Sequence, residues 1–266
     1  MYPILYQWGD FIIPSWFALF LVAATIAARL LLFYGEKFYK IDRAILAQLF
    51  ICCYFGGLLG ARFLSVLVEQ KEVEGFWPVI VATLQFGPLT FYGGAFGTAI
   101  FGGVYIYLRR LNIRQMFDVA LPPALLALAL GRVGCFLNGD DFGLPVSEFL
   151  AAKNLWWTVI FPNLEDSLQR YPVQIFESGV AALGFFFLVC NFKTLNRNYG
   201  DGFVGIFGAT YYAFFRFFIE YFRGDERGWI FSDVLSTSQT LSIAVLLLMF
   251  ILVLRWSNKK EPKPLH

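Results

Sequence analysis

Long apolar stretches alternate with short polar ones along the chain. A helix needs about 20 mainly apolar residues to cross a bilayer. Seven stretches approach this length and are predicted to span a membrane: 14–34, 44–68, 78–108, 116–130, 174–192, 202–222 and 238–255. We expect Gly93, Gly94 and Gly97 to break the third into a re-entrant segment followed by a helix. The fourth is short and begins near Pro122 and Pro123, which leaves its ends open.

The composition strengthens this interpretation. Hydrophobic residues make up 58% of the sequence and charged residues only 15%, whereas a soluble domain carries about 25% charged residues. We therefore predict an all-α polytopic membrane protein with about seven transmembrane helices, in which residues 1–266 form a single integral membrane domain in the lipid bilayer. A net charge of +2 gives no indication of a nucleic-acid partner.

The basic residues predict the orientation, because lysine and arginine concentrate on the cytoplasmic side of membrane proteins. They cluster after the first, third and fifth predicted spans and in the C-terminal tail, whereas the first ten residues and the connection 69–77 contain only Lys71. We expect the N-terminus outside and the C-terminus in the cytoplasm. Residues 131–173, which include Trp156 and Trp157, are then a small outer-face head region between the fourth and fifth spans.

Histidine and cysteine chemistry is limited in this sequence. The only histidine is His266, so a Ser-His-Asp triad, a histidine base and a histidine-bound metal are not expected. The four cysteines, Cys52, Cys53, Cys135 and Cys190, show neither metal-ligand spacing nor a disulfide framework. We therefore expect no metal and no other cofactor.

Arginines near the ends of the apolar stretches are the first candidates for chemistry. Arg62 lies inside the second predicted span, and Arg132 lies in the glycine-rich stretch that follows the fourth. Arg216, Glu220 and Arg223 share one helix face because they are spaced by four and three residues. Four arginines at one membrane depth with too few carboxylates predict a bound anion, and a phospholipid phosphate suits the arginine fork. The alternatives are a snorkelling Arg62 near a helix end and a structural Arg216–Glu220 ion pair.

Two further motifs give weaker signals. Gln174 and Glu177 share one face at the start of the fifth span, where helix capping explains them as well as a binding role does. Tyr92 precedes Gly93 and Gly94, which allow a close approach of the backbone. That approach is either tight helix packing through small residues or the presentation of the Tyr92 hydroxyl to a bound headgroup.

Polar residues also follow Arg132 closely. Asn138, Asp140 and Asp141 lie within nine residues of it, and such residues with glycine also favour a simple turn. We prefer a site, in which Asp140 orients an arginine or accepts a hydroxyl hydrogen bond.

The stretch Gly131-Arg132-x-Gly134-x-Phe136-Leu137-Asn138-Gly139-Asp140-x-x-Gly143 resembles the signature of the prolipoprotein diacylglyceryl transferases. Five more motifs match that family in order: Gly60-x-Arg62, Tyr92-Gly93-Gly94, Tyr171-Pro172-x-Gln174-x-x-Glu177, Arg216-x-x-x-Glu220-x-x-Arg223 and Gln239-x-x-Ser242. The resemblance implies an enzyme of the bacterial inner membrane. Such an enzyme moves the diacylglyceryl group of phosphatidylglycerol onto the lipobox cysteine thiol of a prolipoprotein and releases glycerol 1-phosphate. The seven spans and the orientation predicted above agree with the family.

The resemblance also implies roles for individual residues. Arg132 and Arg216 would hold the lipid phosphate and stabilise the leaving group, Glu220 would orient Arg216, and Tyr92 would act at the thiol or hydrogen-bond the lipid. The residues expected to bind phosphatidylglycerol are Arg62, Gly93, Gly94, Arg132, Asn138, Asp140, Gly143, Gln174, Glu177 and Arg223.

Four positions depart from the family pattern. Tyr92 stands where many members have a histidine proposed to activate the thiol, and Phe17 stands where a tyrosine is common. Cys135 replaces an asparagine, and Asp140 replaces a glutamate. These departures leave open a divergent relative with another lipid donor or acceptor, or a lipid-binding protein without catalysis. A transporter is a third alternative, against which stands the absence of an internal inverted repeat.

Overall fold

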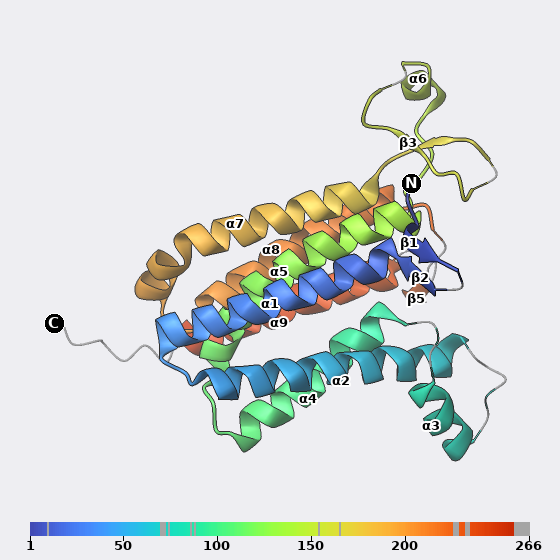
Figure 1. The fold of residues 1–266 in the computed structure, drawn as a ribbon. Helices are drawn as coiled ribbons and strands as arrows, with labels where there is room; N and C mark the ends of the chain where they lie inside the picture. The colour runs from blue at the N-terminus through green and yellow to red at the C-terminus, as the bar shows by residue number, and fades with distance from the viewer. Residues whose placement is uncertain are drawn as a thin grey trace. The chain divides into compact units, whose positions relative to one another are not determined.

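A computed structural model shows a mainly helical chain (Figure 1). It describes residues 1–9, 11–69, 73, 75–85, 87, 89–153, 155–164, 166–225, 229–231 and 235–257. Lys71 and the basic residues of the tail beyond 257, which enter the orientation argument, lie outside the described residues.

The elements follow one another as β1 (Ile4–Trp8), β2 (Phe11–Pro14), α1 (Ser15–Tyr39), α2 (Arg43–Glu69), α3 (Phe76–Leu84), α4 (Phe91–Leu108), α5 (Ile113–Asn138), α6 (Glu148–Ala151), β3 (Val159–Ile160), β4 (Gln169–Arg170), α7 (Val173–Tyr199), α8 (Phe203–Ile219), a 3-10 turn (Glu220–Phe222), β5 (Trp229–Phe231), β6 (Leu235–Ser236) and α9 (Thr237–Ser257). The strands form three separate antiparallel pairs, β1–β2, β3–β4 and β5–β6. The all-α class is therefore confirmed, with short hairpins added.

Six of the described helices, α1, α2, α4, α5, α7 and α9, are long and apolar enough to cross a membrane. The predicted span 202–222 corresponds to α8, which has 17 residues before a 3-10 turn takes over. That length is short of the roughly 20 residues that a span requires. The structure thus confirms a polytopic membrane protein but not the count of seven.

Two predicted boundaries were wrong. The third predicted segment is two helices, α3 and α4, and the break lies between Leu84 and Phe91 rather than at Gly93, Gly94 and Gly97, which are inside α4. The fourth predicted segment is much longer than expected, because α5 runs through both prolines to Asn138. Proline is tolerated in membrane helices where neighbouring groups satisfy the freed backbone atoms. The connection to α7 therefore begins after Asn138, not at residue 131.

The contacts within the chain divide it into two compact units, unit 1 (Met1–Ala27 and Phe117–His266) and unit 2 (Ala28–Met116). Each is described by itself, and the single membrane domain stays a prediction. In unit 1, α8 packs against both α7 and α9. Gly184 of α7 and Gly208 of α8 face leucines of α5, where an added Cβ would lie 3.3 and 3.4 Å from the nearest methyl carbon of Leu125 and Leu121. Small residues thus bring α5, α7 and α8 close together.

A buried carboxylate holds the start of α8. Asp118 of α5 is fully buried and accepts hydrogen bonds from the backbone N–H groups of Gly202 and Gly205, at 2.7 and 2.8 Å. The first N–H groups of a helix have no partner within the helix, and its N-terminus attracts negative charge. Asp118 therefore ties α5 to α8 at the end of unit 1 opposite the head.

Glycines also determine the packing of unit 2, in which α2 packs closely on α4. A Cβ added at Gly60 would lie 2.8 Å from the Cα atom of Gly97, and one added at Gly93 would collide with the carbonyl oxygen of Gly60. Gly93 and Gly97 are four residues apart on α4, as are Gly56 and Gly60 on α2, and this spacing lets backbones meet in membrane helices.

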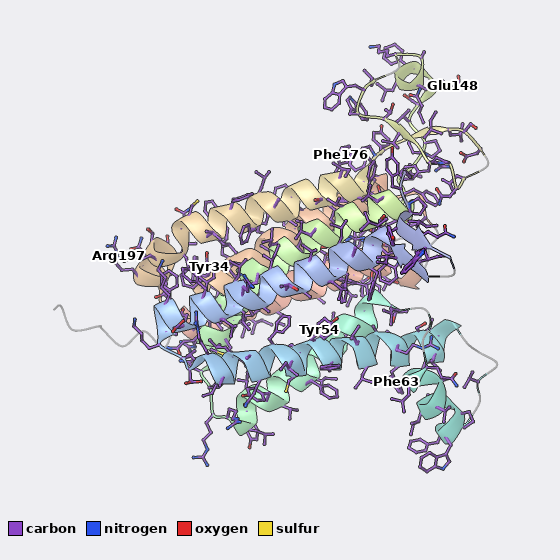
Figure 2. All side chains as sticks on the ribbon, in the orientation of Figure 1. Tyr34, Tyr54, Phe63, Glu148, Phe176 and Arg197 are labelled. Atoms are coloured by element: carbon purple, nitrogen blue, oxygen red, sulfur yellow. The ribbon has the colours of Figure 1, made fainter. Side chains whose placement is uncertain are left out.

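The head of unit 1 lies at the end where α5 stops and α7 begins (Figure 1). It contains α6 and the β3–β4 hairpin. The head is joined to the end of α8 by a bridge between Gly143 and Arg223 and by a hydrogen bond from the Leu144 N–H to the Phe222 carbonyl. Phe176 marks this end of α7 and Arg197 the opposite end (Figure 2). The β1–β2 hairpin of the N-terminus lies at the same end of unit 1 (Figure 1).

Candidate functional site

Glu177, in the second turn of α7, is the centre of a buried charged cluster in unit 1. Its side chain is fully buried. The carboxylate lies 3.0 Å from Nε of Arg132 on α5 and 3.5 Å from Nε of Arg216 on α8. It also accepts a hydrogen bond of 2.5 Å from the Tyr212 hydroxyl. One carboxylate therefore joins three helices, and the capping role considered for Glu177 is not what the structure shows.

Glu220 forms the second carboxylate of the cluster. It lies 2.5 Å from Nη1 of Arg216, one helical turn earlier, as the spacing predicted. The Ser236 hydroxyl donates to its other oxygen at 2.8 Å. Arg216 also donates from Nη2 to the Ser238 hydroxyl at the start of α9, at 2.9 Å. The guanidinium of Arg216 is thus held by groups on α7, α9 and the turn after α8.

Asp141 and Asp225 complete the cluster. Asp141, just beyond α5, places one oxygen 2.5 Å from Nη1 of Arg132 and the other 2.7 Å from Nη2 of Arg223. Asp225 pairs with Arg223 through both oxygens, each at 2.9 Å. Figure 1 shows that the helix ends carrying these residues converge beside the head.

The charge count of this cluster corrects one step of the sequence argument. Among the described residues of unit 1, three arginines (Arg132, Arg216 and Arg223) are paired with four carboxylates (Glu177, Glu220, Asp141 and Asp225). The expectation of too few carboxylates was therefore wrong. A buried arginine needs a partner, and here the protein supplies it. Any anion that bound here would have to compete with these carboxylates for the arginines.

The remaining predicted residues of the signature lie next to this cluster. Gln174 is fully buried and donates from Nε2 to the Asp140 carbonyl at 2.6 Å. The Asn138 amide donates to the Asp140 carboxylate. Asp141, rather than Asp140, makes the ion pair with Arg132, so the expectation that Asp140 orients an arginine was displaced by one residue.

Gly143 is required by the geometry of the connection. A Cβ at this position would collide with the Tyr171 carbonyl oxygen and lie 2.7 Å from Cγ2 of Val173. The Gly143 carbonyl also accepts a hydrogen bond of 3.1 Å from Nη1 of Arg170, whose guanidinium pairs with Asp166. Gly143 therefore allows the head to pack directly on the start of α7.

Four of the predicted site residues, Arg62, Tyr92, Gly93 and Gly94, belong to unit 2. Arg62 is buried rather than snorkelling, and its Nε donates to the carbonyls of Ala82 and Gln85 at the C-terminal end of α3, at 3.2 and 3.0 Å. Cationic side chains commonly satisfy the last carbonyls of a helix.

The Tyr92 motif shows the packing role that was considered for it. Tyr92 is half-buried in the first turn of α4, and Gly93 and Gly94 lie against α2, where a Cβ added at Gly94 would be 3.6 Å from Cβ of Ala61. The two glycines therefore serve tight helix packing. A contact of either glycine with a headgroup stays a prediction.

The two other departures from the family pattern lie in unit 1. Phe17 is exposed in the first turn of α1. Cys135 is half-buried near the end of α5, one turn beyond Arg132.

Sequence reasoning missed Tyr212, Asp225, Ser236 and Ser238 as members of the cluster, and it noted Asp141 beside Arg132 without giving it a role. The sequence could have predicted that Tyr212 belongs to the cluster, because it lies one turn before Arg216 on the helix face that also carries Glu220. The two serines belong to a polar run that opens α9. Asp141 had no local signal that separates it from Asp140.

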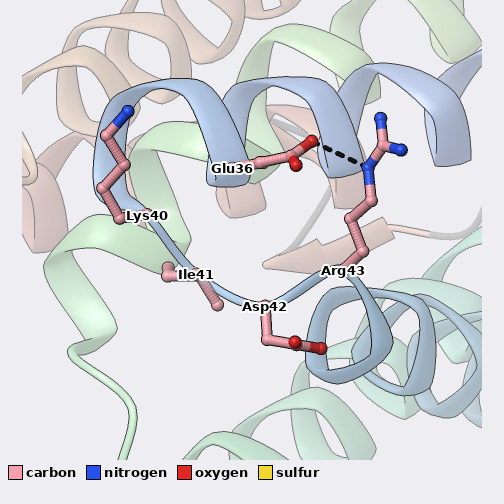
Figure 3. Close-up of a pocket in the computed structure, with 5 residues that line it drawn as sticks. All are labelled: Glu36, Lys40, Ile41, Asp42 and Arg43. Carbon is pink, nitrogen blue, oxygen red and sulfur yellow. Dashed lines mark ion pairs between the residues drawn. The ribbon is translucent and has the colours of Figure 1, made fainter.

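A second charged feature does not resemble a site. A surface hollow at the α1–α2 connection is lined by Glu36, Lys40, Ile41, Asp42 and Arg43 (Figure 3). Its ion pair, between Glu36 and Arg43 at 2.7 Å, is largely exposed. Such exposed ion pairs contribute little to stability. The cluster around Glu177 is therefore the candidate functional site.

Comparisons with known proteins identify a family and relatives that match most of this chain. The profile of the family described as prolipoprotein diacylglyceryl transferase matches residues 3–255. A phosphatidylglycerol–prolipoprotein diacylglyceryl transferase of Dechloromonas aromatica is 32% identical over 208 residues, which cover 77% of this chain and 76% of the relative. Proteins of the same name from Listeria welshimeri and Legionella pneumophila are 26% and 27% identical over 98% and 92% of this chain, and over 91% and 93% of their own lengths. Because the family profile covers nearly the whole sequence, the chain belongs to the prolipoprotein diacylglyceryl transferase family.

Proposed function

We propose that this protein transfers the diacylglyceryl group of phosphatidylglycerol to the lipobox cysteine thiol of a prolipoprotein and releases glycerol 1-phosphate. Membership of the family supports the reaction. The observation that carries the proposed site is the convergence of Arg132 and Arg216 on the buried carboxylate of Glu177. Both arginines belong to motifs of the family and lie at the same end of unit 1.

The proposed chemistry needs fixed positive charge. The thiolate sulfur attacks the glycerol carbon that carries the phosphate ester, after the thiol proton has passed to a base. A carbon–sulfur bond forms while the carbon–oxygen bond breaks, and the oxygen leaves with the bonding electrons on the phosphate. Negative charge therefore moves from sulfur to the leaving glycerol phosphate. Arg132 and Arg216 would stabilise that charge, because prearranged donors act most strongly where water is excluded.

The ion pairs hold the guanidinium groups in fixed positions before the phosphate binds. Arg216 is held from three sides by Glu177, Glu220 and Ser238, so its guanidinium has little freedom to lose when the phosphate binds. Prearranged side chains cost less entropy on binding than mobile ones. Glu220 would thus orient Arg216, and Asn138 and Gly143 would shape the headgroup site.

Further parts of the proposal concern Tyr92 and the membrane. Tyr92 would activate the thiol or hydrogen-bond the lipid, in place of the histidine of many relatives, and Arg62 with Gly93 and Gly94 would contribute to lipid binding. The protein would lie in the bacterial cytoplasmic membrane, with its N-terminus outside, its C-terminus in the cytoplasm and α8 as a short seventh span. The cluster would then lie near the outer surface.

The direct experiment is incubation of the purified protein with phosphatidylglycerol and a lipobox peptide. The expected result is a peptide heavier by one diacylglyceryl group, detected by mass spectrometry. Retention of phosphatidylglycerol without transfer would support the non-catalytic alternative, and transfer from another phospholipid would support the divergent one. If the protein neither bound phosphatidylglycerol nor transferred its diacylglyceryl group, the proposal would be refuted.

Arginine-to-lysine variants test the phosphate role better than alanine variants, each of which would remove one of the cationic partners of Glu177. Lysine keeps the charge but loses the bidentate fork. We expect Arg132→Lys and Arg216→Lys to lower kcat about 100-fold, the order of one lost oxyanion donor, with similar melting temperatures. Arg43→Lys, which changes an exposed arginine paired with Glu36, is the matched control and should be fully active. Full activity in both cluster variants would rule out the phosphate role.

A further inference from the structure

Asp141 supports a further inference, which rests on the proposed function. Its two carboxylate oxygens are used by two different arginines, Arg132 at 2.5 Å and Arg223 at 2.7 Å. Phosphate oxygens are bound by arginine N–H groups in the same manner. Asp141 therefore occupies donors that a phosphate would use.

The attachment of Asp141 differs from that of the two glutamates. Its side chain is 21% exposed, against 0% for Glu177 and 7% for Glu220. Each glutamate also accepts a hydrogen bond from a hydroxyl, of Tyr212 or of Ser236, whereas Asp141 accepts one from the Cys135 thiol, which is a weak donor. Asp141 lies outside a helix, in the left-handed backbone region with φ of 59°. Of the two carboxylates that pair with Arg132, Glu177 and Asp141, Asp141 can turn away with the least change to the helices.

The charges of the cluster indicate which change must accompany phosphate binding. Three arginines already face four carboxylates among the described residues. A phosphodiester would add another negative charge beside these carboxylates, and like charges in a buried site repel strongly. Release of Asp141 frees one donor on Arg132 and one on Arg223 and removes as much negative charge as the phosphodiester adds. Asp225 still pairs with Arg223 after that release.

We propose that Asp141 is a built-in counter-anion, which competes with the phosphate of the lipid for Arg132 and Arg223. As a positioning residue it holds both guanidiniums in place and is displaced when phosphatidylglycerol binds. It returns as glycerol 1-phosphate leaves. The competition weakens the binding of both molecules and speeds the release of the product.

The test replaces Asp141 with asparagine, which has the same size, lacks the charge and tolerates the left-handed backbone. We expect Asp141→Asn to lower the KM for phosphatidylglycerol and the Kd for glycerol 1-phosphate about tenfold, because a neutral amide competes with the phosphate for the guanidiniums less strongly than a carboxylate does. The kcat should stay the same or fall, since the product leaves more slowly. Asp166→Asn is the matched control, because Asp166 pairs with Arg170 in the head, and both constants should stay as in the wild type.

Asp141→Gly provides a second variant, because glycine suits the positive φ without a side chain. It should lower both constants as Asp141→Asn does. Constants that are unchanged or higher would overturn the proposal, and failure of both variants to fold would show a structural role instead. The Kd for glycerol 1-phosphate, measured by thermal shift, tests Asp141 separately from catalysis. A wild type that binds glycerol 1-phosphate but transfers nothing would refute the proposed function alone.

Discussion

Replacement of Glu177 by leucine tests whether the buried cluster holds unit 1 together. Leucine has a similar size but cannot pair with Arg132 or Arg216. The variant leaves two buried guanidiniums without the carboxylate that lies 3.0 and 3.5 Å from them. It also removes the acceptor of the Tyr212 hydroxyl.

The expected cost follows from these distances. At 3.0 to 3.5 Å the gross attraction of each pair is about 5 kcal/mol with an effective dielectric constant of 20. The desolvation of the charges offsets much of this attraction in the intact cluster. Removal of Glu177 leaves Arg132 with Asp141 and Arg216 with Glu220 as their remaining acidic partners. The loss of one partner from a buried ion pair costs about 3–5 kcal/mol. We therefore expect Glu177→Leu to lower the melting temperature by roughly 10 °C.

The amide variant separates charge from hydrogen bonding. Glu177→Gln keeps an oxygen that accepts from Tyr212 and from the arginines, so we expect a smaller loss of about 1–3 kcal/mol. The charge count also favours this variant, because three arginines would then face three carboxylates among the described residues.

Thermal unfolding of the detergent-solubilised protein, followed by circular dichroism, measures both effects. Glu36→Leu is the control, because it removes an exposed carboxylate that also pairs with one arginine. Surface pairs contribute at most about 1 kcal/mol. A melting temperature for Glu177→Leu that equals that of Glu36→Leu would refute the reasoning.

Three further variants test other parts of the structure. Gly143→Ala should abolish transfer and lower the melting temperature, because its Cβ would collide with a backbone carbonyl. In the control Gly131→Ala the Cβ meets no described neighbour within 4 Å, so this change should stabilise α5 by roughly 0.5–1 kcal/mol. Equal effects of the two changes on the melting temperature would contradict this contrast. Tyr212→Phe should cost about 1–3 kcal/mol in thermal unfolding, because it removes a hydrogen bond to a buried carboxylate, and an unchanged melting temperature would refute it. Gly93→Ala should impair the folding of unit 2, measured as the yield of monodisperse protein, while Gly103→Ala, which has open space among the described residues, should not.

Helix periodicity accounts for the parts that the sequence predicted well. Arg216 and Glu220 meet as expected, since residues four apart share a helix face regardless of the rest of the fold. The glycine pairs of α2 and α4 also have a readable spacing, although the sequence does not say which helix each one meets. These predictions depend only on local geometry.

The partners across the fold could not be predicted in the same way. Asp141 pairs with Arg223, 82 residues further along the chain, and no spacing rule relates two such positions. The count of arginines against carboxylates failed for this reason. It considered the acids within the helical motifs, whereas Asp141 and Asp225 lie outside α-helices.

The glycine-rich signature shows why local composition misplaced the end of α5. Glycines and a charge within an apolar segment usually mark a break, because an unpaired charge and a flexible backbone both oppose a membrane helix. In the structure the helix continues to Asn138, and Arg132 inside it is paired with Glu177 of α7 and with Asp141. Glu177 on another helix and Asp141 just beyond the end of α5 therefore offset the cost of the buried charge. A charged stretch next to a membrane span can remain helical when the fold supplies the counter-charge, and here that counter-charge also forms the candidate site.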